Sequence, residues 1–366
     1  MKNPEHYPQY DMSIRRDCRF FLGDMPCKLH KQKGLVCSDC SHFEPKGKRI
    51  VIIKLGAIGD IIRTTPLVRK LKEVYPGCEI TWVTFVPEVV PSVVDHILKF
   101  DANILLRLLA EKYDILYSLD KDKEACALAN LIRADVKKGF VLENGSCSPI
   151  DPDAVHKYLT GLHDGLNKRN KLSYQQEIFQ IVGLPYSHEE YILDIPTLRI
   201  SLPKLAGNVV GLNTGTSARW PTRNWPKENW VKLANLLLQE GFSAILLGGE
   251  LEHEKNLAIA KATGAYYHGP VPLDQFVHLV NLCDILVTSV TMALHFAIGL
   301  NKKIVLFNNI FNSAEFDLYG RGVVLEPELG CLGCFKSKSD SGCPVPNCMS
   351  LINPEKAFDT VKQVLR

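Results

Sequence analysis

Residues 49–62 read RIVIIKLGAIGDII, and this stretch decides the fold class of the chain. Ile50–Lys54 form a short, β-branched apolar run of the kind that becomes a buried parallel strand. Gly56 and Gly59 make a tight loop after it, and an amphipathic run with helical spacing continues to Val74. A strand, a glycine loop and a helix in this order predict the first unit of a parallel α/β sheet.

The same theme returns at residues 208–221, NVVGLNTGTSARWP, where a short apolar strand again ends in a glycine-bearing polar loop. Strand-like and helix-like runs alternate on both sides of a mostly helical, then loosely patterned segment over residues 151–195. We therefore predict two α/β halves of similar construction. The expected parts are an arm over 1–47, a first half over 48–195, a second half over 196–352 with a cysteine-rich loop at 331–348, and a terminal helix over 353–366.

The composition is that of a soluble globular protein. With 366 residues, 46% of them hydrophobic and 23% charged, the chain is long enough for two domains that each bury a core. Residues 1–16 contain no apolar core of a secretory signal, and no apolar run approaches the roughly 20 residues that span a bilayer. A net charge of +3 is too small to indicate a nucleic-acid partner. We therefore expect a cytoplasmic protein.

Eight of the twelve cysteines fall into two groups near opposite ends of the chain. In a reducing cytosol, clustered cysteines indicate metal ligands rather than disulfides. Each group has four thiols with one Cys-x-x-Cys pair, which suits structural zinc or an iron–sulfur cluster without distinguishing them. Unligated thiols are the alternative, and one shared site or two separate sites both stay open. The groups are Cys18, Cys27, Cys37 and Cys40, and Cys331, Cys334, Cys343 and Cys348.

Asp60 stands where the first glycine loop becomes a helix. It is interpreted either as the helix N-cap or as a carboxylate at the sheet edge where α/β proteins bind ligands, and its position alone favours the cap. Neither glycine loop carries a dinucleotide fingerprint or a P-loop. The Asp-Lys-Asp run at 120–122 matches a metal-binding pattern of some sugar transferases, but its flanking charge favours a solvated turn.

Two polar loops of the second half indicate an anion site. In the first loop, hydroxyl and guanidinium groups follow a strand, a combination that suits phosphate. In the second, Ser289 and Thr291 lead into a helix whose first amides would face a ligand, with His295 one turn further on as either a ligand or a packing residue. Glu250 follows another strand and is either a ribose ligand or an exposed charge. The candidates of the first loop are Thr214, Thr216, Ser217, Arg219 and Arg223.

Five stretches together, between about residue 49 and the C-terminus, resemble the family 9 glycosyltransferases, the heptosyltransferase family that builds lipopolysaccharide core. They are IKLGAIGDIIRTTPLVRKLKEVYPG at 53–77, RNWPKENWVKLANLL at 223–237, ILLGGELEHE at 245–254, LHFAIGLNKKIVLF at 294–307, and the late run at 331–349 that begins CLGCF and ends CPVPNCM. The resemblance implies the GT-B fold, in which two Rossmann-like domains face each other across a cleft. It also implies that the last helix packs back across the first domain.

The resemblance further implies sugar transfer from a nucleotide-diphosphate donor, ADP-heptose by default, with inversion and without a catalytic metal. The expected acceptor is a hydroxyl of a lipopolysaccharide core or related glycan, reached from the inner face of a membrane. Asp60 matches the catalytic base, Arg223 the diphosphate ligand and Glu250 the ribose ligand. Thr291 and His295 match the phosphate-binding helix start. The acceptor side would be formed by Gly56, Gly59 and Arg63.

Two departures separate the chain from this pattern. Val290, Thr291 and Met292 stand where the family commonly has Asp-Thr/Ser-Gly, so either the donor sits differently or activity is impaired. The cysteine-bearing arm precedes the point where ordinary heptosyltransferases begin. The alternative function is therefore a non-catalytic or redox-responsive nucleotide-sugar-binding protein. A third alternative is a nucleotide-sugar epimerase of the same fold, which the motif order disfavours.

Overall fold

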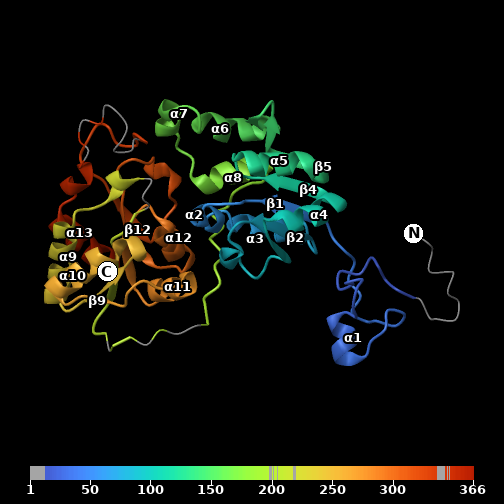
Figure 1. Cartoon of the computed structure of the whole chain (residues 1–366), viewed down its shortest axis with the longest axis horizontal. Helices are drawn as coiled ribbons and strands as arrows, with labels where there is room; N and C mark the ends of the chain where they lie inside the picture. Colours follow the sequence, from blue (N-terminus) through green and yellow to red (C-terminus); the bar gives the residue numbers. More distant parts are fainter. Residues whose placement is uncertain are drawn as a thin grey trace.

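The computed structural model of the chain describes residues 13–197, 200, 202–203, 205–216, 220–335, 343, 345 and 347–366. Two α/β domains lie side by side, and a small arm stands beyond the first domain, on the side away from the second (Figure 1). This arrangement confirms the two predicted halves.

The first domain is built on a six-stranded sheet in the order β3-β2-β1-β4-β5-β6. Neighbouring strands are parallel except for the antiparallel pair β5 and β6. All of β1 except its first residue is buried, as the unbroken β-branched run predicts. The strands are β1 (Arg49–Ile53), β2 (Glu79–Thr84), β3 (His96–Lys99), β4 (Lys112–Ser118), β5 (Arg133–Glu143) and β6 (Ser146–Pro149).

Helices cover both faces of this sheet (Figure 1). Asp101, Asp151 and Ser173 cap three of them with side-chain oxygens that accept backbone amides of the first turn. The helices are α2 (Ile58–Ile62), α3 (Pro66–Val74), α4 (Ala102–Ala110), α5 (Lys123–Leu131), α6 (Pro152–Thr160), α7 (Asp164–Arg169) and α8 (Tyr174–Val182), with the 3-10 turn η2 (Pro87–Val89).

The second domain repeats the design with a parallel sheet in the order β12-β11-β10-β7-β8-β9. Its strands are β7 (Val209–Asn213), β8 (Ser243–Leu247), β9 (Tyr266–Tyr267), β10 (Ile285–Ser289), β11 (Lys303–Phe307) and β12 (Gly322–Leu325). Its helices are α9 (Lys227–Gln239), α10 (His253–Thr263), α11 (Leu273–Asn281), α12 (Met292–Gly299) and α13 (Pro354–Leu365). Its 3-10 turns are η3 (Pro221–Arg223), η4 (Glu250–Glu252), η5 (Ser313–Glu315) and η6 (Cys348–Leu351).

The last helix, α13, packs on its own domain. Its buried Ala357, Phe358 and Val361 join the core cluster of the second sheet, and its main neighbours are α9 and β11. Lys303 Nζ of β11 donates to the carbonyl of Leu365 at 2.8 Å. The expectation that this helix packs back across the first domain is therefore wrong, because its apolar face is used to close the second domain's core.

The two domains meet along one interface beside their glycine loops. Helix α2 of the first domain packs against α12 of the second, and one cluster of buried apolar side chains continues from the first sheet to the second. Farther along, Tyr319 Oη donates to the carbonyl of Glu189 at 2.9 Å, and Arg321 pairs with Glu190 at 2.8 Å. These contacts hold the carboxyl edges of both sheets toward each other.

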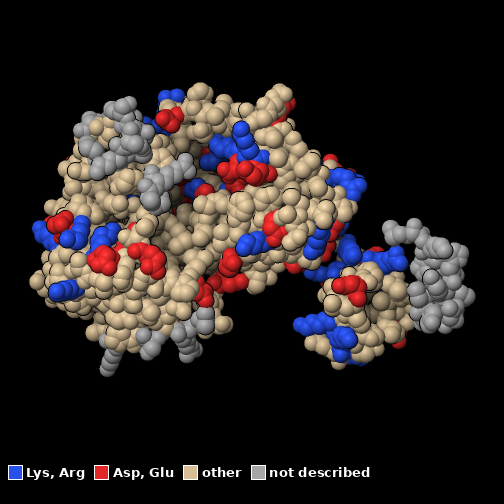
Figure 2. Space-filling view, in the orientation of Figure 1, with Lys and Arg blue, Asp and Glu red and all other residues tan. Residues whose placement is uncertain are grey.

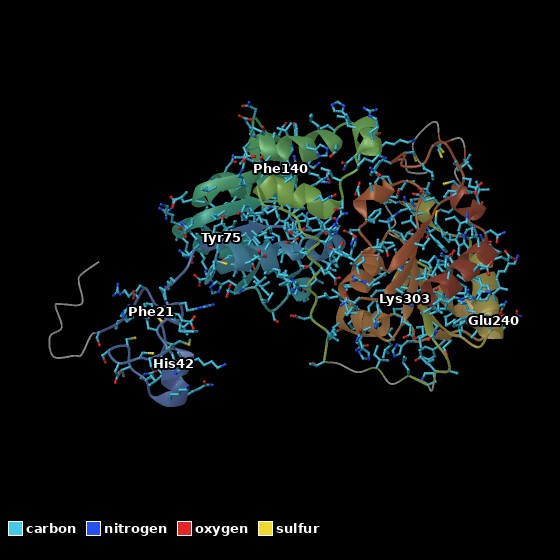
Figure 3. All side chains as sticks on the ribbon, turned by 180° about the vertical axis from the view of Figure 1, so that it is seen from behind. Phe21, His42, Tyr75, Phe140, Glu240 and Lys303 are labelled. Atoms are coloured by element: carbon cyan, nitrogen blue, oxygen red, sulfur yellow. The ribbon has the colours of Figure 1, made fainter. Side chains whose placement is uncertain are left out.

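The described part of the arm, residues 13–47, has no core of its own. None of these residues is buried, and their helix α1 (Lys28–Lys33) is capped by the sulfur of Cys27. Its ends pair through the amide of Arg19, which donates to Glu44 at 2.8 Å, and through a β-bridge between Cys18 and Pro45. Figure 3 shows the arm, marked by Phe21 and His42, standing apart from the domain that carries Tyr75 and Phe140.

Gly139 lets β5 run close against β4. Its φ is +100°, and a Cβ there would lie 1.8 Å from the carbonyl oxygen of Ser118. We expect Gly139→Ala to lower the free energy of unfolding of the first domain by about 3 kcal/mol, because it adds backbone strain and a clash. Urea unfolding followed by tryptophan fluorescence measures this loss.

The matched control is Gly145→Ala in the β5–β6 turn. Its φ is +75°, but no atom lies within 4 Å of the added Cβ. Only backbone strain of about 1 kcal/mol is expected there. Equal losses for the two variants would contradict the assigned β4–β5 contact.

Candidate active site

A cleft of about 800 Å³ opens between the two domains, at the carboxyl edges of both sheets. Figure 2 shows the hollow between the domains, with charged side chains gathered beside it on the first domain. Ligands of doubly wound α/β proteins bind at this edge, where strand ends leave loops and helix N-termini exposed. Residues 57–60 line one wall, and residues 290–293 line the other.

Asp60 lies in the first turn of α2, and the N-cap of that helix is Ala57. The interpretation of Asp60 as an N-cap is therefore wrong. Its carboxylate pairs with Arg63, whose Nε donates to Oδ1 at 2.9 Å, while 35% of the Asp60 side chain stays exposed in the cleft. Burial disfavours the charged carboxylate, but the charges of Arg63 and Lys54 outweigh it and hold the pKa of Asp60 below its ordinary value. Asp60 is an ionised, accessible carboxylate at neutral pH.

A buried ion pair supports the loop that carries Asp60. Lys54 Nζ pairs with Asp120 Oδ1, and the other carboxylate oxygen accepts the amide of Leu55 at 2.5 Å. Both charged side chains are 5% exposed. The expectation of a solvated turn is therefore wrong for Asp120, because this carboxylate neutralises the lysine at the end of β1. A lysine that ends an otherwise apolar strand is the sequence signal for such a partner.

His295 meets the first domain directly. A Cβ at Gly59 would lie 2.4 Å from His295 Cδ2, so only glycine allows α2 to approach α12 this closely. Burial, assisted by the charge of Arg63, lowers the pKa of His295 to about 3, so its imidazole is neutral. The ring stacks on Tyr191 with centroids 6.3 Å apart and also lines the cleft. His295 thus serves both packing and the site.

Arg223 belongs to the cleft wall of the second domain, on turn η3. Its guanidinium donates through Nη1 to the carbonyl of Val290, and Ser289 Oγ donates to the Arg223 carbonyl at 3.0 Å. Burial lowers the pKa of Arg223 to about 10, which leaves it charged at neutral pH. The two loops predicted to bind anions are therefore joined, with Arg223 fixed beside the start of α12.

Thr291 is the N-cap residue of α12 and lines the cleft with Met292. Its hydroxyl accepts Asn213 Nδ2 at 3.2 Å and lies 3.2 Å from the hydroxyl of Thr288. This buried polar cluster orients the first turn of α12, whose free backbone amides favour an anion.

The other predicted site residues divide between the cleft lining and places outside it. Thr216 lines the cleft, but Thr214 is buried and donates to Asn256 Oδ1 at 2.6 Å. Glu250 is exposed on η4 and is not part of the cleft lining, whereas Glu252 of the same turn is. Gly56 is also not part of the lining, whereas Gly59 and Arg63 are. Ser217 and Arg219 lie outside the described residues.

Sequence reasoning missed Glu252. Its carboxylate accepts the amide of Gly249 at 3.0 Å and lines the cleft from the second domain. Both residues sit in one 3-10 turn, so the sequence identifies the turn but not which of its carboxylates faces the cleft.

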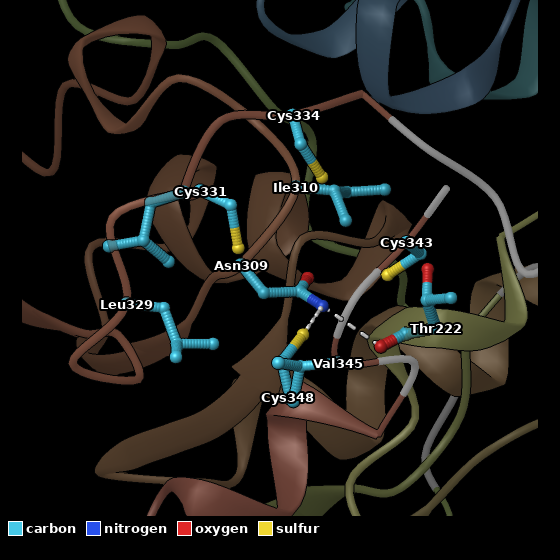
Figure 4. A pocket seen from close by; sticks show the side chains of 10 residues that line it. Thr222, Asn309, Ile310, Leu329, Cys331, Cys334, Cys343, Val345 and Cys348 are labelled. Atoms are coloured by element: carbon cyan, nitrogen blue, oxygen red, sulfur yellow. Dashed lines mark hydrogen bonds between the residues drawn. The ribbon is translucent and has the colours of Figure 1, made fainter. Parts of the chain in front are cut away.

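The C-terminal cysteines gather around one small cavity. Cys331, Cys334, Cys343 and Cys348 line it, and their sulfur atoms point inward (Figure 4). Cys348 Sγ also accepts Asn309 Nδ2 at 3.2 Å. Nevertheless, within the described residues no three His, Cys, Asp or Glu side chains stand close enough together to define a metal site. The arm cysteines are partly buried and lie at the other end of the molecule (Figure 1).

The two α/β domains and the cleft between them have the architecture of the GT-B class. The chain belongs to glycosyltransferase family 9, the heptosyltransferase family, because residues 103–337, more than half of the chain, match the profile described as "Glycosyltransferase family 9 (heptosyltransferase)". The resemblance drawn from the sequence is confirmed. A comparison with curated proteins found no match.

Solved structures share this fold at low identity. A family 9 glycosyltransferase from Veillonella parvula is 18% identical, with a TM-score of 0.63, over 87% of this chain and 97% of its own. The E. coli heptosyltransferase WaaC, with ADP-2-deoxy-2-fluoro heptose, is 16% identical, with a TM-score of 0.58, over 86% and 99%. The iron-containing dodecameric glycosyltransferase TibC of enterotoxigenic E. coli is 12% identical, with a TM-score of 0.57, over 88% and 79%.

In the part of the chain that the structure describes, no helix is both long and apolar enough to cross a bilayer.

Arg63 sets the charge of Asp60, which gives a test by pH. In Arg63→Met the pKa of Asp60 should rise, because the nearest cation is lost. If Asp60 acts as the base, the variant should lose activity at a higher pH than the wild-type protein as the pH is lowered from 8 toward 5, because only the ionised carboxylate accepts a proton. The wild-type protein should show no acid-side loss due to Asp60 in this range. Turnover measured across this range checks the difference.

The control is Arg69→Met on the exposed face of α3. Its pH profile should match that of the wild-type protein. An unchanged profile in Arg63→Met would contradict the role given to Arg63.

Proposed function

We propose that the chain transfers a sugar, with heptose as the default, from a nucleotide-diphosphate donor to a hydroxyl of a lipopolysaccharide-core or related glycan acceptor, with inversion. One observation carries this proposal. The ionised Asp60 lines one wall of the cleft, and Arg223 with the start of α12 lines the other. Family membership supports it. WaaC with ADP-2-deoxy-2-fluoro heptose and TibC with ADP-D-beta-D-heptose support the choice of donor.

In this reaction Asp60 accepts the proton of the acceptor hydroxyl as that oxygen attacks the anomeric carbon. The new glycosidic bond forms while the bond from the anomeric carbon to the diphosphate oxygen breaks. A carboxylate with a lowered pKa is a weak base, so its contribution comes mainly from position. Arg63 keeps it ionised and fixes its orientation.

The departing diphosphate would be stabilised from the second domain. Arg223 supplies a fixed cation, and the first amides of α12 supply oriented dipoles, so no metal is needed for this step. Val290 stands at the first position of the family's Asp-Thr/Ser-Gly motif, and its carbonyl accepts a hydrogen bond from Arg223. Met292 lines the cleft at the third position and narrows the space beside the phosphates. We propose Glu252, with Glu250 as the alternative, for the ribose hydroxyls.

The acceptor would bind on the first domain, beside Gly59 and Arg63. A glycolipid acceptor would place the enzyme in the cytoplasm at the inner face of a membrane. The alternative of a nucleotide-sugar-binding protein without turnover has the departures at Val290 and Met292 in its favour.

Separating binding from turnover tests this function. A panel of nucleotide-diphosphate sugars, ADP-heptose included, is titrated by calorimetry and assayed for transfer. Asp60→Ala should abolish transfer and leave donor affinity within about twofold, because the base does not contact the diphosphate. Arg223→Met should weaken the affinity for the nucleoside diphosphate by on the order of 10- to 100-fold, since a charged hydrogen bond is lost.

Two outcomes would contradict the proposal. Donor binding without turnover in the wild-type protein would favour the non-catalytic alternative. Full turnover in Asp60→Ala would remove the assignment of the base.

We also propose that each cysteine group holds a structural metal, zinc or iron, as a single ion or an iron–sulfur cluster. At the C-terminal loop, the four inward-pointing sulfurs and the amide donated to Cys348 suit a thiolate site. The iron of TibC supports a metal there. In the arm, the absence of any buried side chain from residues 13–47 supports a cross-link, because so small a module lacks a core to stabilise it.

Metal analysis tests both sites separately. Purified protein should hold metal at both groups, and Cys40→Ser should lose only the arm's share, since a missing thiolate opens the ligand set. Cys331→Ser should lose only the share of the loop. Plasma mass spectrometry measures the content, with Cys147→Ser as the control because Cys147 belongs to neither group. A folded, metal-free protein with all thiols titratable would refute the proposal.

A further inference from the structure

Asn309 connects the cysteine cavity to the donor side of the cleft. It follows β11 and is 3% exposed. Its Nδ2 donates to the carbonyl of Thr222 at 2.9 Å and to Cys348 Sγ at 3.2 Å, and Figure 4 shows both bonds. Thr222 immediately precedes Arg223 in turn η3. One buried amide group therefore joins the cysteine cavity to the residue beside the candidate diphosphate ligand.

A second set of contacts joins the cysteine loop to the segment that leads to Arg223. The amide of Gly333 donates to the Asn309 carbonyl at 3.0 Å, and the amide of Phe335 donates to the Ile310 carbonyl at 2.9 Å. The cysteine loop is thus hydrogen-bonded along the segment that follows β11. Both routes act on one short stretch of backbone.

The side chains continue this second route into the cleft. The ring of Phe335 packs edge-on against Phe311, with centroids 5.4 Å apart. Phe311 lines the cleft, and the guanidinium of Arg223 lies 5.2 Å from its ring centroid. Movement of the cysteine loop therefore reaches the phosphate side of the cleft through packed groups.

Arg223 is held in place by burial and by hydrogen bonds at its side chain and its backbone. It is buried, its guanidinium is bonded to the Val290 carbonyl, and its own carbonyl accepts Ser289 Oγ. A displacement of the Thr222 carbonyl must then move Arg223 relative to the start of α12. Because donor binding depends on both, affinity is sensitive to what holds Thr222 in place.

We propose that Asn309 is a positioning residue that couples the cysteine cluster to donor binding. When Cys348 is held in the cluster, Asn309 fixes the Thr222 carbonyl and thereby Arg223. When the cluster is disrupted, Arg223 loses this support and the nucleoside diphosphate binds more weakly. The chemical step is little affected, since Asp60 and Arg63 belong to the other domain. The inference rests on the proposed function, because it takes Arg223 as the diphosphate ligand.

A double-mutant cycle tests the coupling in the full chain. ADP affinity is measured by calorimetry for the wild-type protein, Asn309→Ala, Cys348→Ala and the double variant. Each single variant should weaken ADP binding by on the order of five- to tenfold, and the double variant should be no weaker than either single one. In transfer assays KM for the donor should rise while kcat stays within about twofold.

Asn308→Ala is the matched control. Asn308 is a buried neighbour whose Nδ2 donates to the Phe311 carbonyl at 2.9 Å and to Glu326 Oε1 at 2.6 Å. Its loss perturbs the same segment without removing either bond of Asn309. Combined with Cys348→Ala, it should give additive losses of ADP affinity, because Asn308 does not carry the coupling.

The outcomes separate the proposals. Unchanged ADP affinity in Asn309→Ala or Cys348→Ala, or additive effects of the two, would overturn the coupling. If the wild-type protein binds neither ADP nor any other nucleoside diphosphate, the proposed function fails and the coupling fails with it. Metal content measured on the same samples decides the metal proposal independently, since the cycle needs only the Asn309–Cys348 contact. Thermal melting of each variant identifies any loss caused by unfolding.

Discussion

The close approach of Gly59 to His295 is the constraint on which the site depends. Because no side chain stands at Gly59, α2 and α12 pack directly against each other, and the carboxyl edges of both sheets line one cleft. The buried imidazole stays neutral, so the contact brings no unpaired charge into the interface. The carboxylate of Asp60 and the start of α12, for which we propose the roles of base and phosphate ligand, are held on opposite walls of the cleft by this packing contact.

The electrostatics of the cleft also cross the domain boundary. Arg63 pairs with Asp60 in its own domain, and its Nη1 lies 3.7 Å from Glu315 of the second domain. Beneath it, the buried Lys54–Asp120 pair supplies a further charge and holds the loop backbone. Breaking a buried pair of this kind leaves an uncompensated charge, which is far costlier than loss of a surface ion pair. The ionisation of Asp60 thus depends on charged groups of both domains.

The sequence predicted the architecture because apolar runs and glycine loops mark strands, helices and their junctions locally. The resemblance to family 9, and not local position, implied that Asp60, Arg223 and Thr291 share one cleft, and all three line it. It could not predict where α13 packs, since an amphipathic helix specifies an apolar face and not its partner. Flanking lysines concealed the burial of Asp120, and a 3-10 turn decided that Glu252 and not Glu250 lines the cleft. Such facts depend on tertiary contacts that no local pattern contains.

The arm, in contrast to the two domains, has little packing contact with the rest of the chain. None of its described residues is buried, and none joins the apolar clusters of either domain. The described part of the arm meets the first domain through surface charge, since Arg19 lies 4.0 Å from Asp95, and not through apolar packing. Substitutions on the exposed surface of the arm therefore leave the apolar packing of both domains unchanged. The surface of the arm can diversify toward new partners while the cleft stays under its own constraints.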